Sequence, residues 1–157
     1  MSTLPDILPE VATASGFLLV LILLLPFASV LLALVLGGRN PRRVAFLALP
    51  AGLALAGAIA LAASRAGQPL IYLLGNWAPP LGVALRADGL SVTMLLTTAV
   101  IILGVAIYAR SDFAPASGGG ETRTSLMFWI LLLAVWGSLN LIFLAGDLFT
   151  LYVALEL

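Results

Sequence analysis

Four apolar stretches of 20 residues each decide what this chain can fold into. They cover residues 17–36, 44–63, 90–109 and 126–145. Each matches the roughly 20 apolar residues that an α-helix needs to cross the hydrocarbon core of a bilayer. The sequence therefore predicts an all-α integral membrane protein with four complete transmembrane helices.

A fifth apolar segment, residues 148–157, is shorter. Ten residues of helix cover only about 15 Å, whereas the hydrocarbon core is about 30 Å thick. We expect this segment to be the start of a fifth helix, which a longer polypeptide or a second chain completes. The expected organisation is a single membrane domain, 1–157, with an external flap at 64–89 and a cytoplasmic loop at 110–124.

Composition agrees with this class and excludes others. Hydrophobic residues make up 62% of the 157 and charged residues 9%, as in integral membrane proteins. The seven basic residues, all Arg, balance seven acidic ones, so nucleic acid is not an expected partner. Because Cys and His are absent, we expect no metal site and no cofactor. The sequence also contains no motif of an enzyme active site.

The placement of Arg predicts the orientation. Five Arg follow the first and third apolar stretches, against two in the long loop after the second. Because loops rich in Arg and Lys face the cytoplasm, the N-terminus is predicted to lie outside. In the external flap, Tyr72 and Trp77 suit the lipid boundary, and the alternation over residues 81–86 allows a short strand or hairpin.

Glu156 is the strongest candidate for a functional residue. It lies nine residues after Asp147, so a helix that starts there carries it about 13 Å, close to the middle of the hydrocarbon core. An ionisable group at that depth is costly and typically marks an ion or proton pathway. Burial favours its neutral form and a nearby ammonium its charged form. The sequence thus predicts a buried proton-transfer site; the structural alternative is a fixed ion pair.

Three further polar residues are candidates for supporting roles. Tyr152 precedes Glu156 by four residues on the same helix face, where its hydroxyl can bond the carboxylate or simply pack. Asp147 is half a turn out of phase with Glu156 and is predicted to cap the fifth helix. Asn140 can line a hydrated path or bond to a neighbouring helix, and the second use is commoner.

Two features of the spans predict helix packing rather than chemistry. Pro26 and Pro50 are expected to kink the first and second helices, since proline removes a backbone hydrogen bond. Small residues gather at 51–58 in the second helix. Because small side chains let helix backbones approach closely in membranes, we expect the second helix to pack tightly on a neighbour.

Two segments carry a resemblance to a known family. They are residues 75–91, GNWAPPLGVALRADGLS, and residues 139–156, LNLIFLAGDLFTLYVALE. Together they resemble the antiporter-like membrane subunits: the Mrp D proteins of cation/proton antiporters and the homologous proton-pumping subunits of complex I and of membrane-bound hydrogenases. The sharpest part is Gly-Asp-Leu-Phe at 146–149, followed by Tyr152 and Glu156, which is most similar to the Mrp D type. The resemblance spans this chain and the N-terminal third of a typical member.

The resemblance implies a larger subunit built from inverted helix repeats. Glu156 falls on the family's essential glutamate in the fifth helix, which works with a lysine of the seventh. Because this chain has no Lys, a further chain or segment must supply that partner and the missing helices. Alone, the chain is not expected to translocate ions.

The predicted function is therefore part of a proton- or cation/proton-translocating subunit, which is not itself an enzyme. We expect a multi-pass protein of the bacterial inner membrane, with H⁺ and Na⁺ as candidate ions. Other membrane subunits of a multisubunit complex, a redox-driven pump among the candidates, and the lipid bilayer are its expected partners. Two alternatives stay open: a non-conducting scaffold or accessory subunit, and a partner in a CO₂- or bicarbonate-accumulating complex energised by proton-motive force.

Overall fold

The computed structural model describes residues 13, 15–37, 40–76, 82–112 and 123–156. Among these residues, four helices are long and apolar enough to cross a membrane. The predicted all-α membrane class is thereby confirmed, with a small hairpin added. The spanning helices are α1 (Phe17–Leu36), α2 (Asn40–Ala66), α3 (Gly89–Asp112) and α4 (Arg123–Leu144), and a shorter α5 (Leu148–Glu156) follows.

The helix ends follow local chemistry as well as hydropathy. α1 has the limits of its apolar stretch, whereas α2 begins at Asn40 and ends at Ala66, beyond the apolar stretch on both sides. Pro41 suits a first helical turn because its missing N–H would be unpaired there anyway. Arg65 lies in the last turn, where a cation complements the helix dipole.

A two-stranded antiparallel hairpin connects α2 with α3. Strand β1 (Leu70–Leu73) pairs with β2 (Ala84–Ala87), with Leu70 opposite Ala87, and a short 3-10 turn, η1 (Leu74–Asn76), follows β1. The hairpin that the alternating pattern allowed is therefore present. Trp77 and most of the predicted cytoplasmic loop lie outside the described residues.

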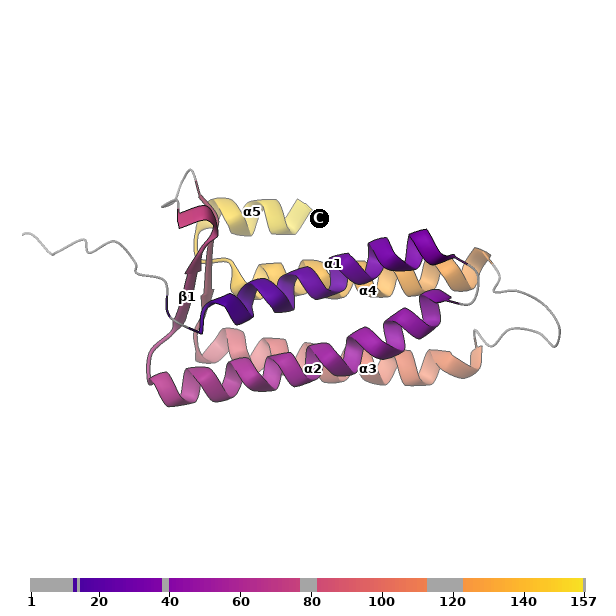
Figure 1. Ribbon diagram of the computed structural model, residues 1–157, viewed down its shortest axis with the longest axis horizontal. Coiled ribbons are helices and arrows are strands. Elements are labelled where there is room, and N and C mark those ends of the chain that lie inside the picture. The colour runs from indigo at the N-terminus through magenta and orange to yellow at the C-terminus, as the bar shows by residue number, and fades with distance from the viewer. Residues whose placement is uncertain (1–12, 14, 38–39, 77–81, 113–122, 157) are drawn as a thin grey trace, which may run out of the picture.

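The helices run side by side, and the hairpin lies across one end of them (Figure 1). α1 packs on α2 and α4, α2 packs on α3, and α5 packs on α4. At the hairpin end, one core cluster joins Leu70 and Leu85 of the strands to residues of the four long helices. A second cluster, around Trp129 and Trp136 of α4, fills the other half of the bundle. The hairpin is thus part of the core and fixes the end from which α5 departs.

α2 and α4 meet through a glycine and a tryptophan. A side-chain carbon at Gly52 would overlap Cζ2 and Cη2 of the Trp136 indole, whereas one at Gly57 would meet no atom within 4 Å. Trp136 is 1% exposed. The tight packing expected of the small residues in α2 therefore occurs at Gly52, and α4 is the helix it contacts.

Candidate functional site

The turn before α5 is held by the hairpin. The Gly146 N–H donates to the Ala84 carbonyl of β2 at 2.9 Å, and Ala145 pairs with Leu85 in an isolated antiparallel bridge. A Cβ at Gly146 would lie 2.8 Å from the same Ala84 oxygen, which is closer than real side chains approach. Glycine at this position lets the turn dock on β2, and the docked turn sets the direction of α5.

Asp147 caps the N-terminus of α5. Its carboxylate accepts hydrogen bonds from the Thr150 backbone N–H at 2.8 Å and from the Thr150 hydroxyl at 2.6 Å. Partial burial raises the pKa of Asp147, but the bonds from Thr150, Ala84 and Phe149 outweigh it, so the pKa lies below its usual value. The predicted capping role is confirmed, and the carboxylate helps to join α5 to the hairpin.

Asp88 caps α3 in the same manner, a role that is not among the predictions from the sequence. Its carboxylate accepts bonds from the Ser91 N–H at 2.9 Å and from the Ser91 hydroxyl at 3.1 Å. The backbone bond from Ser91 is the main reason why the pKa of Asp88 is lowered, and the charge of Arg86 contributes. The signal was available: Asp followed three residues later by Ser or Thr occurs just before both helices.

Removal of the Asp147 cap has a predictable effect on stability. Asp147→Ala should lower the free energy of unfolding at neutral pH by about 1 kcal/mol, because a backbone donor of α5 loses its acceptor. Since the folded pKa is depressed, the stabilising effect is complete above the unfolded pKa of about 3.9 and is lost as pH falls through the folded pKa. Thermal unfolding in detergent, compared with wild type across that range, measures the difference.

The control for this prediction is Asp112→Ala, which removes an exposed carboxylate at the end of α3. That variant should be no less stable than wild type at neutral pH, because a carboxylate in the last turn of a helix does not complement the helix dipole. An Asp147→Ala protein as stable as wild type at neutral pH would contradict the capping role.

Glu156 and Tyr152 lie together on the outward face of α5. The helix turns Thr150 and Ala154 inward, at 3% and 1% exposure, while Tyr152 is 60% exposed and Glu156 is exposed. The Tyr152 hydroxyl hydrogen-bonds the Glu156 carboxylate one turn away. The described residues therefore do not bury Glu156, which lies on the face of α5 that points away from the bundle.

No basic side chain of the described bundle lies within the central part of a spanning helix. Arg42 and Arg43 lie in the first turn of α2, Arg65 in its last turn, Arg110 in the last turn of α3, and Arg123 at the start of α4. Glu156 instead lies about 13 Å along its helix from the Asp147 cap. Among the described residues, no basic side chain therefore lies at a comparable depth within a spanning helix.

Asn140 belongs to a different place in the fold. Its side chain is fully buried against α1, and its Nδ2 donates to the Ile22 carbonyl at 3.2 Å. Pro26 has no N–H, so the carbonyl four residues earlier, that of Ile22, has no partner within α1. Asn140 therefore satisfies a backbone group that the proline frees. The bond to a neighbouring helix is the use that the structure supports, and Asn140 is not brought together with Glu156.

The link between Asn140 and Pro26 can be tested by a double-mutant cycle. Asn140→Leu should destabilise the wild type by about 1–2 kcal/mol, because the Ile22 carbonyl loses its buried partner. In a Pro26→Ala background, the new N–H can bond this carbonyl, so the cost of Asn140→Leu should be smaller. Thermal unfolding of the four proteins gives the coupling energy. Equal costs in both backgrounds would contradict the assignment.

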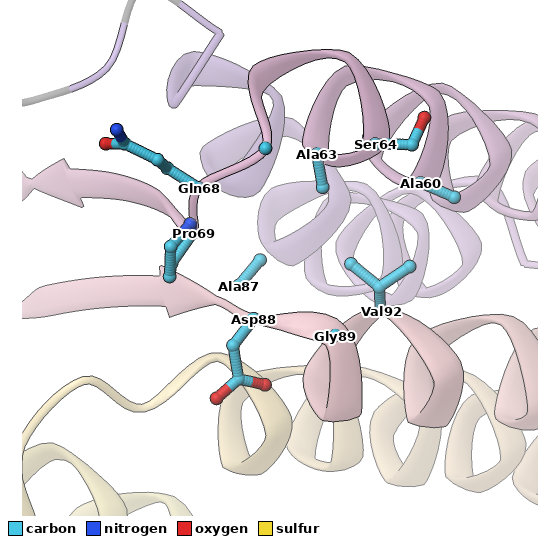
Figure 2. Close-up of a pocket in the computed structure, with 10 residues that line it drawn as sticks. Ala60, Ala63, Ser64, Gln68, Pro69, Ala87, Asp88, Gly89 and Val92 are labelled. Atoms are coloured by element: carbon cyan, nitrogen blue, oxygen red, sulfur yellow. The ribbon is translucent and has the colours of Figure 1, made fainter.

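A pocket of about 360 Å³ lies between the end of α2 and the start of α3, below the hairpin. Figure 2 shows Ala63, Ala87 and Val92 meeting between these elements, while the Asp88 carboxylate and the Gln68 amide turn away from them. The walls of the pocket are thus mainly apolar, and the polar groups at its edge do not converge on a common point. This arrangement of the described residues does not favour catalysis or ion binding.

Comparison with known proteins gives sequence relatives among oxidoreductase and antiporter subunits, although no family model matches the chain. The N subunit of NADH-quinone oxidoreductase from Desulforudis audaxviator is 34% identical over 102 residues, which are 64% of this chain and 20% of that protein. The D subunit of a Na(+)/H(+) antiporter from Bacillus subtilis is 38% identical over 88 residues, 54% of this chain and 16% of the relative. The D subunit of a probable K(+)/H(+) antiporter from Rhizobium meliloti is 38% identical over 87 residues, which are 55% of this chain and 15% of that protein.

A solved structure shares the fold. It is a chain of the membrane-bound sulfane sulfur reductase, an archaeal respiratory membrane complex, with a TM-score of 0.74 and 20% identity. The structural match covers 88% of the present chain and 28% of the chain in the solved structure. The present chain also spans a fifth or less of the length of its curated relatives. Sequence and fold together confirm the resemblance of this multi-pass membrane chain to the antiporter-like membrane subunit family.

Proposed function

We propose that this chain is part of a proton- or cation/proton-translocating subunit in which Glu156 is a proton-transfer site within the membrane. One observation carries the proposal: α5, whose other residues are mostly apolar, presents a carboxylate on the face that the described bundle leaves uncovered. An ionisable group in a membrane helix is costly unless a partner or water meets it. The partner is a basic group of a neighbouring chain or segment.

The geometry of α5 supports an exchangeable proton. Asp147 anchors the helix at the hairpin end, and Glu156 lies about 13 Å further along, near the middle of a hydrocarbon core about 30 Å thick. In the charged state, the carboxylate accepts the hydrogen bond of Tyr152. In the neutral state, the carboxyl group carries a proton of its own and can release it to water or to the basic partner. Tyr152 is thus a positioning residue, which keeps the carboxylate orientation while its charge changes.

The names of the relatives give the candidate ions. Two of them are named as Na(+)/H(+) and K(+)/H(+) antiporter subunits, and one as a subunit of an NADH-quinone oxidoreductase. For the present chain we propose H⁺ as the translocated ion, with Na⁺ or K⁺ as the exchanged cation. Its partners are other membrane subunits of a bacterial inner-membrane complex, and Glu156 performs proton transfer rather than enzymatic catalysis.

A hydrophobic carbodiimide tests the site directly. Carbodiimides couple to protonated carboxyl groups, and an apolar reagent reaches those exposed to hydrocarbon. In the full complex in membranes, the reagent should modify Glu156, as mapped by mass spectrometry, and proton translocation should fall in proportion to the modification. Asp112, in the last turn of α3, should stay unmodified. Complete modification of Glu156 without loss of translocation would contradict the proposal, as would the absence of labelling.

A further inference from the structure

Two hollows lie along α2, one against α1 and one against Ser15, just before α1. We refer to the two together as the furrow. One, of about 350 Å³, lies midway along the pair, between Leu21, Leu24 and Ala28 of α1 and Ala51 and Leu55 of α2. The other, of about 420 Å³, lies toward the hairpin end. α1 and α2 are the two long helices nearest the viewer in Figure 1.

The two hollows lie along one face of α2. Of the residues that α2 contributes, five recur every three or four positions and so form a stripe on a helix with 3.6 residues per turn, while Leu61 and Ala66 lie beside this stripe. The stripe begins with small and apolar side chains and ends with a guanidinium. Its members are Ala51, Leu55, Ala58, Ala62 and Arg65.

The hollow at the hairpin end differs chemically from the one in the middle. Arg65 and Ser15 contribute to its lining, whereas the middle hollow is lined only by Leu and Ala. No acidic side chain lines either hollow among the described residues. The furrow therefore combines an apolar channel with a cation at one end, and no carboxylate of its lining neutralises that cation.

The dimensions fit one leaflet of a bilayer. Fourteen residues separate Ala51 from Arg65, or about 21 Å along the helix. Half of a bilayer, with its headgroup region, is about 20–22 Å thick. Arg65 is thus at the level of lipid phosphates when Ala51 is near the bilayer midplane. Guanidinium is the side-chain group best suited to hold a phosphate, because its N–H groups bind two oxygens in parallel.

We propose that this furrow binds one phospholipid, with its phosphate on Arg65 and an acyl chain along the α1–α2 groove. The Ser15 hydroxyl supplies a further polar contact at the headgroup end. The occupant is a lipid rather than a protein helix, because a phosphate matches the single cation and a flexible chain fills a shallow apolar groove without polar partners. The site is independent of the proton-transfer role of Glu156.

Native mass spectrometry of the full complex in mild detergent tests the site, with either phosphatidylglycerol or a diacylglycerol of the same acyl chains added. The wild-type protein should retain one phosphatidylglycerol and no diacylglycerol. Arg65→Gln should lower this occupancy about tenfold or more, because a charge-assisted bond is lost. Ala58→Phe, which fills the furrow at a lipid-facing position, should lower it as well. Arg43→Gln, an exposed arginine at the other end of α2, should not.

Three results would overturn the proposal. Equal retention of phosphatidylglycerol by wild type and Arg65→Gln would show that the cation does not hold the phosphate. Equal retention of diacylglycerol would show that the phosphate is not recognised. Loss of a co-purifying protein in Ala58→Phe, with no lipid on the wild type, would mean that a neighbouring protein covers the furrow. Thermal unfolding confirms that each variant is folded before its lipid is counted.

Discussion

Glu156→Gln in the full complex is expected to lower proton translocation by about a hundredfold or more, a loss typical of removing a group that transfers protons. Glutamine has nearly the shape of glutamate, and its amide oxygen can still accept the hydrogen bond of Tyr152. It cannot take up or release a proton near neutral pH. The expected loss therefore reports proton exchange and not packing. Inverted membrane vesicles, in which a cation pulse drives a pH change, give the measurement.

Two further variants distinguish proton transfer from positioning. Glu156→Asp keeps the carboxylate but shortens the side chain, so translocation should be reduced and not abolished. Tyr152→Phe removes the hydroxyl that holds the carboxylate and should slow translocation less than Glu156→Gln does. The matched control is Asp112→Asn, which neutralises an exposed carboxylate outside α5. Normal translocation by an assembled Glu156→Gln complex would instead favour the non-conducting scaffold.

The sequence predicted those features that depend on local periodicity. Apolar length predicted the spanning helices, alternation over residues 81–86 allowed a short strand or hairpin, and Asp147 ahead of an apolar run predicted a cap. The helical repeat also placed Tyr152 and Glu156 on one face, where the structure has them hydrogen-bonded. Each of these inferences needs only residues that are close in sequence.

The features that were missed depend on residues far apart in the chain. Pro26 and Asn140 were each weighed alone, but nothing in their spacing indicates that Asn140 bonds the Ile22 carbonyl, 118 positions away. The docking of Gly146 on Ala84 likewise joins two segments that periodicity treats separately. Periodicity also left open which side of α5 meets the bundle. The inward face proved to be that of Thr150 and Ala154, so Glu156 faces outward.

Gly52→Ala is expected to destabilise the chain more than the same substitution at Gly57, the other glycine of α2. A Cβ at Gly52 would overlap the Trp136 indole. Because the indole is a rigid, buried ring, it cannot relieve the overlap by a small change of rotamer. Overpacking of this kind costs about 1–3 kcal/mol. That cost outweighs the gain of up to about 1 kcal/mol that alanine brings over glycine inside a helix. Thermal unfolding in detergent measures the net effect.

Gly57→Ala is the matched control, because it adds the same methyl group to the same helix where no atom lies within 4 Å. It should be neutral or slightly stabilising, since only the helix propensity changes. Trp136→Leu gives the complementary test: alone it leaves a cavity, but together with Gly52→Ala the methyl group enters space that the indole has vacated. The double variant should therefore be more stable than the sum of the two single losses predicts. Additive losses would mean that the two side chains do not compete for the same space, and the close contact of α2 with α4 would then have to lie elsewhere.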